Sequence, residues 1–246
     1  MNIKKILIGL IIIIFSTSAF FSLSTNEKIA IIEIEGVIDN PKKYLSSIKE
    51  IRDSESFKGA IVRIDSPGGT VGSSQEIYKS LSSLSNKIPT VASIIDIGAS
   101  GGYMIACGTS YIFANEGSIT GSIGVISEYY NFSELIKFLK FDIETIKSGE
   151  MKDIGDPTRK LNEKEKKLLN NLVKDIHNQF KSTVSKKRGL SKEEIDLISD
   201  GRIFSGNQAL SLKLIDEIGG LEAAVKYIEK KIGISDLEIE YFPKKE

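Results

Sequence analysis

The chain has 246 residues, 41% of them hydrophobic, and its Lys plus Arg and Asp plus Glu residues both total 33. This length and composition suit one sizeable α/β domain or two small ones and argue against a disordered chain, and the balanced charge excludes the basic field that would attract nucleic acid. One cysteine rules out an intramolecular disulfide, and with a single histidine we expect no metal site of the common His/Cys kind.

The amino terminus has the pattern of a membrane-targeting segment. Lys4 and Lys5 precede an apolar stretch, 6–23, that is interrupted only by one glycine and a few hydroxyl residues. Its length suits a signal anchor or a signal peptide, and it offers only a mediocre cleavage region. We therefore expect residues 1–24 to be a single-pass anchor in the cell membrane, with residues 25–246 as one extracytoplasmic domain. A buried core helix is the alternative interpretation.

Strands and helices alternate in the first half of the chain. The patterns predict strands over 28–34, 59–65 and 90–97, a helix over 42–52, and a helix with Ile77, Leu81 and Leu84 on its apolar face. Such βαβ units predict a parallel sheet with right-handed crossovers. The carboxyl ends of parallel strands meet at one sheet edge, where sites are built. We therefore expect Gly68 and Gly69, which follow one strand, to lie near Ser100, which follows another.

The second half continues in the same way. The patterns predict strands over 111–114, 141–146 and 237–242, extended chain over 117–126, helices over 132–139, 162–187 and 221–232, and short helices after Ser191 and Ser205. Asn162 and Glu165 have the spacing of a capping box at the start of the long helix. A polar loop containing glycine and proline spans 147–159, and loops of this length are often functional or mobile.

Ser100 is the candidate nucleophile. It lies in the segment Gly98-Ala99-Ser100-Gly101-Gly102-Tyr103, between an apolar strand and a predicted helix. The glycines permit a tight turn and a close approach of another chain segment, and the start of a helix offers free N–H groups to a developing anion. Serine hydrolases need this geometry. The alternative interpretation is a turn of small residues that only packs one element against another.

A serine nucleophile needs a positioned base, and two residues are candidates. His177 is the single histidine, but it is expected at the edge of the apolar stripe of the long helix, which favours a packing role. Lys152 lies in the glycine-containing loop 148–155, away from the charged helix faces. A lysine acts as a base when burial or positive charge lowers its pKa from about 10.4 toward 7 to 8. The residues alone leave both candidates open.

Five blocks together carry a family resemblance. They are Asp65-Ser66-Pro67-Gly68-Gly69, Ala99-Ser100-Gly101-Gly102-Tyr103, Ile119-Thr120-Gly121-Ser122-Ile123-Gly124-Val125, Ser148-Gly149 with Lys152-Asp153-Ile154-Gly155 and Arg159, and Asp200-Gly201-Arg202-Ile203-Phe204-Ser205-Gly206. In order and spacing they resemble the signature of the signal peptide peptidase A family, peptidase family S49. The resemblance runs from about Ile29 to Gly220, and the chain is similar in length to the bacterial short form of this family.

The resemblance implies a ClpP/crotonase-like α/β fold and a membrane-anchored serine endopeptidase with a Ser/Lys dyad. Ser100 corresponds to the nucleophile, Lys152 to the general base, and Ser122 to the serine that orients the lysine amine. The backbone N–H groups of Gly69 and Gly101 correspond to the oxyanion hole. No metal or organic cofactor is required for this chemistry.

The resemblance also implies substrates and assembly. Family members degrade remnant signal peptides and other unfolded apolar peptides at the membrane. The chain resembles one half of a longer, duplicated form, so Ser100 and Lys152 are expected to meet across the subunit interfaces of a homo-oligomer. Two alternatives stay open: a non-catalytic, membrane-associated scaffold that binds peptides, and a related protease that cuts segments of membrane proteins.

Overall fold

The computed structural model describes residues 27–244, which form two compact units. Unit 1 contains the residues up to Gly121 and those from Phe204 onward, and unit 2 is Ser122–Ile203. The anchor predicted over residues 1–24 lies outside the described residues. Within residues 27–244, none of the helices combines the length and the apolar composition needed to cross a membrane. The domain bounds 25–246 stay a prediction.

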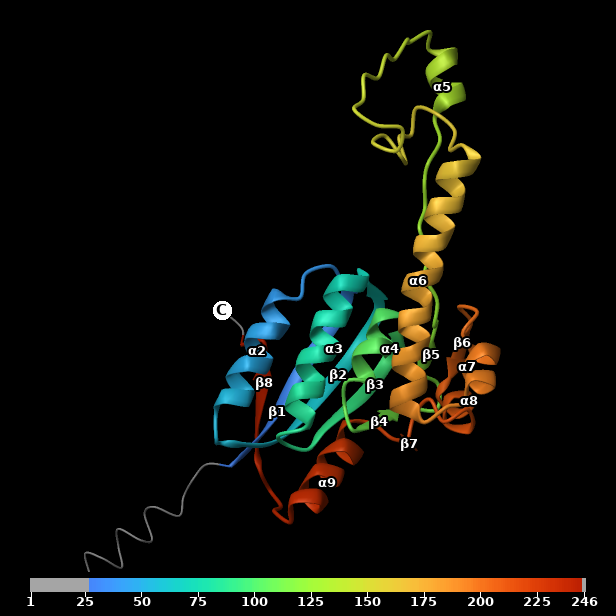
Figure 1. Cartoon of the computed structure of the whole chain (residues 1–246). Helices are drawn as coiled ribbons and strands as arrows, with labels where there is room; N and C mark the ends of the chain where they lie inside the picture. The colour runs from blue at the N-terminus through green and yellow to red at the C-terminus, as the bar shows by residue number, and fades with distance from the viewer. Residues whose placement is uncertain (1–26, 245–246) are drawn as a thin grey trace, which may run out of the picture. The chain divides into compact units, whose positions relative to one another are not determined.

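Unit 1 is built on a parallel β-sheet (Figure 1). Its elements are β1 (Lys28–Ile38), α2 (Lys42–Asp53), β2 (Phe57–Gly69), α3 (Val71–Ser85), β3 (Thr90–Ala99), α4 (Gly101–Ala106), β4 (Tyr111–Ala114), β5 (Ile119–Gly121), β6 (Ile203–Ser205), α8 (Gly206–Ser211), β7 (Glu217–Ile218), α9 (Leu221–Ile232) and β8 (Glu238–Phe242). The strand order is β6-β5-β3-β2-β1-β8, with β4 beside β3 and β7 beside β4. Strand β2 runs parallel to β1 and β3, and β3 runs parallel to both β4 and β5. The prediction of an α/β fold with a parallel sheet is confirmed.

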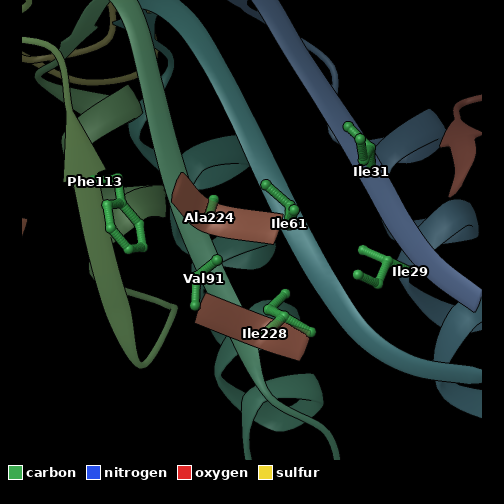
Figure 2. Packing of buried hydrophobic residues seen from close by; sticks show 7 residues of the cluster. All are labelled: Ile29, Ile31, Ile61, Val91, Phe113, Ala224 and Ile228. Atoms are coloured by element: carbon green, nitrogen blue, oxygen red, sulfur yellow. The ribbon is translucent and has the colours of Figure 1, made fainter. Parts of the chain in front are cut away.

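The central strands are apolar because helices cover both faces of the sheet. Helix α9 packs on one face, where Ala224 and Ile228 contact a cluster of buried strand residues (Figure 2). The cluster members from the strands are Ile29, Ile31, Ile61, Val91 and Phe113. Helices α2, α3 and α4 lie on the other face (Figure 1). This double cover holds β2 and β3 rigidly side by side, and their carboxyl ends carry the candidate site.

Unit 2 contains one long helix, two short helices and long irregular segments. Its helices are α5 (Ser133–Phe138), α6 (Glu163–Arg188) and α7 (Lys192–Ile198), and α6 packs against α7. The predicted capping box is confirmed, since the Asn162 side chain accepts the Glu165 N–H and the Glu165 side chain accepts the Asn162 N–H. Gly189 ends α6 in the left-handed conformation, with φ 64°. Helix α6 is therefore fixed at both ends by its own sequence.

The structure corrects several predicted elements. Residues 141–146 form no strand, and Phe141, Ile143 and Ile146 are 66%, 53% and 94% exposed. Their alternating apolar pattern suits a strand, but a strand needs a hydrogen-bonding neighbour, and none lies beside this segment in the described part of unit 2. The extended chain predicted over 117–126 includes β5, and positive φ values at Gly121 (81°) and Ser122 (51°) interrupt it. Strand β2 continues past its predicted end through Gly69, and the two-residue strand β7 was not predicted.

Candidate active site

Ser100 occupies a strained turn between β3 and α4. Its backbone has φ 52° and ψ −120°, and it is the residue that precedes the first turn of α4. Positive φ is uncommon for a residue with a side chain and persists where the surroundings enforce it. One such restraint is direct, because the Ser100 N–H donates to the Gly121 carbonyl at 2.9 Å. The side chain is half-buried at the carboxyl edge of the sheet.

The end of β2 lies against this turn. Ser66 is in register with Gly98, and a Cβ placed on Gly68 would be 2.6 Å from the Gly101 nitrogen and 2.9 Å from Ser100 Cβ. Gly68 also has φ +101°. No other residue type would fit here without moving the Ser100 turn. The predicted proximity of the two glycine-containing segments is confirmed.

Gly69 and Gly101 are also neighbours. A Cβ placed on Gly101 would be 2.3 Å from Ser74 Oγ and 3.3 Å from the Gly69 nitrogen, so Gly101 lies close to both the first turns of α3 and the end of β2. Gly101 is the first residue of α4, and the first N–H groups of a helix have no acceptor within the helix. The structure therefore brings Ser100, Gly69 and Gly101 together within unit 1.

Two residues not identified from the sequence as site residues support these backbones. Ser66 is fully buried, and its hydroxyl donates to the Gly36 carbonyl at 2.6 Å while it accepts the Gly68 N–H at 3.1 Å. Tyr103 is fully buried behind the turn and donates its hydroxyl to the Leu214 carbonyl at 2.7 Å. Both residues lie in the sequence blocks that carry the family resemblance, but their hydrogen-bond partners are distant in sequence. Only the fold identifies those partners.

Ser122 and Lys152 belong to unit 2. Ser122 is half-buried, has φ 51°, and donates its N–H to the Arg202 carbonyl at 2.8 Å. Lys152 is exposed in a turn, where its N–H donates to the Gly149 carbonyl at 3.2 Å. Within unit 2, as far as the structure describes it, no hydrogen bond joins these two residues. Their predicted roles stay predictions.

Charged side chains surround the residue next to Lys152. The Asp153 carboxylate accepts Arg159 Nε at 2.8 Å and Lys147 Nζ at 2.6 Å. These two cations, Arg159 foremost, hold the pKa of Asp153 well below its ordinary value. Asp153 therefore stays ionised at any pH at which the protein would work.

His177 lies on α6 with its Nε2 atom 3.3 Å from the Ile123 carbonyl. This contact joins α6 to the chain that follows Ser122, which fits the packing role considered for His177. Among residues 27–244, no group of three or more His, Cys, Asp or Glu side chains is placed to hold a metal ion.

Together these features define an α/β protein with a candidate nucleophile at the carboxyl edge of a parallel sheet. Comparison with known proteins identifies the group to which it belongs. Residues 82–235 match the family model described as Peptidase family S49, and the chain belongs to this family. It is thus a member of a protease family, as the sequence blocks indicated.

Individual relatives bear protease names. Over 222 residues the chain is 43% identical to "Putative protease slr0021" of Synechocystis, and the aligned region covers 89% of this chain and 80% of the relative. Over 230 residues it is 34% identical to "Putative signal peptide peptidase SppA" of Enterococcus faecium, covering 88% and 67%. Over 222 residues it is 31% identical to "Serine protease SPPA, chloroplastic" of Arabidopsis thaliana, covering 85% of this chain but 33% of that longer protein.

Proposed function

We propose that this protein is a serine endopeptidase in which Ser100 is the nucleophile and Lys152 the general base. The observation that carries the proposal is the Ser100 turn, with its φ of 52° and the glycines of β2 packed against it. A strained turn that presents a serine hydroxyl at the edge of a sheet is also the arrangement of the nucleophilic serine in α/β-hydrolases. We further propose that the sheet and its helices form a ClpP/crotonase-like fold.

In the proposed reaction, Ser100 Oγ attacks the peptide carbonyl carbon while its proton moves to Lys152 Nζ. The N–H groups of Gly69 and Gly101 bind the oxyanion of the tetrahedral intermediate, each contributing on the order of 3 kcal/mol. Collapse of this intermediate breaks the C–N bond, and Lys152 returns the proton to the leaving amine. Water then hydrolyses the acyl-enzyme. The Ser122 hydroxyl orients the lysine amine throughout, and no metal or organic cofactor takes part.

The proposal includes a homo-oligomer in which Ser100 of one copy meets Lys152 of another. Unit 2 supports it, because the described residues between 126 and 146 leave many large apolar side chains exposed. These are Ile126, Tyr129, Tyr130, Phe132, Leu135, Phe138, Leu139, Phe141, Ile143 and Ile146. Large apolar side chains gathered on a protein surface usually mark an interaction site.

The proposed substrates are remnant signal peptides and other unfolded apolar peptides, and the proposed location is the cell membrane. The apolar stretch 6–23 supports anchoring through residues 1–24, with the protease domain extracytoplasmic. The name of the Enterococcus faecium relative supports the substrate class. The balanced charge of the chain gives no reason to expect a nucleic-acid partner.

The proposal is tested by labelling the full chain, extracted in detergent, with a fluorophosphonate probe. The wild type is compared with Ser100→Ala and Lys152→Ala, and circular dichroism checks that all three are folded. Labelling of the wild type alone supports an activated serine that depends on Lys152. Equal labelling of the wild type and Lys152→Ala contradicts the proposed base, and no labelling of any folded oligomer favours the peptide-binding scaffold.

A further inference from the structure

The Arg159 guanidinium is the most fully bound charged group near Lys152. Its Nε donates to Asp153 Oδ2 at 2.8 Å, and its Nη2 donates to the Asp153 carbonyl at 3.0 Å and to Glu165 Oε1 at 2.5 Å. Its Nη1 donates to Glu165 Oε2 at 2.9 Å and to the Lys160 carbonyl at 3.3 Å. A guanidinium carries five N–H donors. Arg159 therefore uses every donor that it has.

The Arg159 hydrogen bonds connect Glu165 on one side with Asp153 on the other, and the Glu165 side is rigid. The Glu165 side chain is fully buried and lies in the first turn of α6, where it also accepts the Asn162 N–H at 2.8 Å. The paired guanidinium, together with the Asn162 N–H, lowers the pKa of Glu165 to about 2. A buried carboxylate without its cationic partner would be strongly destabilising. Arg159 is therefore fixed to the start of a 26-residue helix.

The other end of the arrangement is the turn that bears Lys152. Asp153, the next residue, is held through both its carboxylate and its carbonyl by Arg159, and Lys147 binds its second carboxylate oxygen. The backbone hydrogen bonds donated by Lys152, Ile154 and Asp156 are all local, each to the residue three positions earlier. Local hydrogen bonds set the conformation of the turn but do not fix its position relative to α6. The Arg159 contacts connect it to α6.

We propose that Arg159 is a positioning residue that ties the Lys152 turn to the start of α6. The inference rests on the proposed function, in which Lys152 is the base. Because Lys152 is exposed, the place of its amine depends on the backbone from which it extends. A base that is displaced by about 1 Å from its reaction geometry can cost about 100-fold in rate. Arg159 keeps that backbone in one place.

The geometry requires an arginine. Lysine could supply the positive charge but has a single nitrogen, so it cannot bind the two Glu165 oxygens as a planar fork and reach Asp153 in addition. The chain also offers a matched control. Lys164 on α6 pairs with Glu150 of the same turn at 3.0 Å, but these side chains are 71% and 58% exposed. An exposed pair of this kind holds a turn weakly.

The test compares Arg159→Gln, Arg159→Lys and Lys164→Gln with the wild type and Lys152→Ala in the full, detergent-extracted chain. Cleavage of a quenched fluorescent peptide of small and apolar residues gives kcat and KM, and hydrogen exchange reports on residues 147–160. We expect Arg159→Gln to lower kcat about 100-fold, with KM within about twofold and faster exchange in the turn. We expect Arg159→Lys to lower kcat about tenfold and Lys164→Gln to leave it within about twofold.

Each other outcome has a definite meaning. If Lys152→Ala is inactive but Arg159→Gln keeps its kcat, or loses it without faster exchange in the turn, the inference is wrong and the proposed function stands. If Lys152→Ala is fully active, the proposed function fails, and Arg159 loses its assigned role. Equal losses in Arg159→Gln and Lys164→Gln also overturn the inference, because they would indicate a general effect of charge. If Arg159→Gln does not fold, Arg159→Lys decides on the same criteria.

Discussion

Gly68 lies so close to Gly101 that a Cβ attached to Gly68 would be 2.6 Å from the Gly101 nitrogen. The neighbour in this contact is backbone, so it cannot rotate away as a side chain can. The φ of +101° at Gly68 adds a second reason against any side chain there. The end of β2 and the Ser100 turn are therefore in direct main-chain contact, and this contact leaves no room for a side chain at Gly68.

The first prediction concerns the Gly68→Ala variant. The added methyl group must push the Ser100 turn away and also adopt a backbone conformation unfavourable for alanine, so we expect the free energy of unfolding to fall by more than about 2 kcal/mol. Fluorophosphonate labelling of Ser100 should fall at least about tenfold, because the serine hydroxyl moves. Urea denaturation and the rate of labelling measure the two effects.

The matched control for this substitution is Gly72→Ala in α3. A Cβ on Gly72 meets nothing within 4 Å, and its φ is not in the left-handed region. This variant should stay within about 1 kcal/mol of the wild type and keep its labelling rate. If the two variants behaved alike, the close approach of β2 to the Ser100 turn would be wrong.

The sequence was sufficient to predict the turn and the sheet. The strand before Ser100 is a run of apolar and β-branched residues, and glycines flank the serine, so both periodicity and turn chemistry indicated the same place. The helix start at Asn162 was predicted for a similar reason, since a capping box is contained in four consecutive residues. Signals that lie within one segment can be read without the fold.

Features that depend on contact with residues distant in the sequence could not be predicted from local patterns. The alternating pattern of 141–146 suggested a strand, but whether a neighbouring strand exists is decided by the fold. The capping role of Glu165 was visible, whereas its pairing with Arg159 depends on how the loop between them closes. The same holds for Ser66, whose hydroxyl binds the carbonyl of Gly36 on another strand.

The second prediction concerns the Tyr103→Phe variant. Removing the hydroxyl leaves the Leu214 carbonyl without this buried donor, which should lower the free energy of unfolding by about 1–3 kcal/mol. Tyr241→Phe is the control, because Tyr241 on β8 is 49% exposed and its hydroxyl can bind water. Urea denaturation of the two variants compares them directly. Equal stability would show that the Tyr103 hydroxyl does not hold α4 in place.

The third prediction is a pH dependence. Arg159, foremost, and the Asn162 N–H lower the pKa of Glu165 from an ordinary 4.5 to about 2. A lowered folded-state pKa stabilises the fold above the ordinary value, and this contribution is lost as the pH falls toward 2. The difference in unfolding midpoint between the wild type and Glu165→Gln should therefore be constant above about pH 4.5 and shrink below it.

Thermal unfolding of the two proteins at a series of pH values measures this difference. Asp153, whose pKa is also lowered, is present in both proteins, so its titration contributes to both curves. Arg159 stays charged in both proteins, because an arginine side chain keeps its proton at every pH of this series. A difference that kept its size down to about pH 3 would contradict the assigned pairing.

The last prediction tests whether the proposed dyad forms between copies of the chain. Ser100→Ala and Lys152→Ala are each expected to be inactive, but a site that takes Ser100 from one copy and Lys152 from another can regain both groups in a mixed oligomer. Random mixing in equal amounts should restore about one quarter of the wild-type sites, whereas sites formed within single chains would restore none. Peptide cleavage after co-expression measures the recovery, and cross-linking of differently tagged chains confirms mixing.

The control for this prediction mixes the wild type with the Ser100→Ala, Lys152→Ala double variant. It should keep about one quarter of the activity if sites form between chains and about one half if they form within chains. No recovery in proven mixed oligomers, together with one half in the control, would place both groups in the same chain.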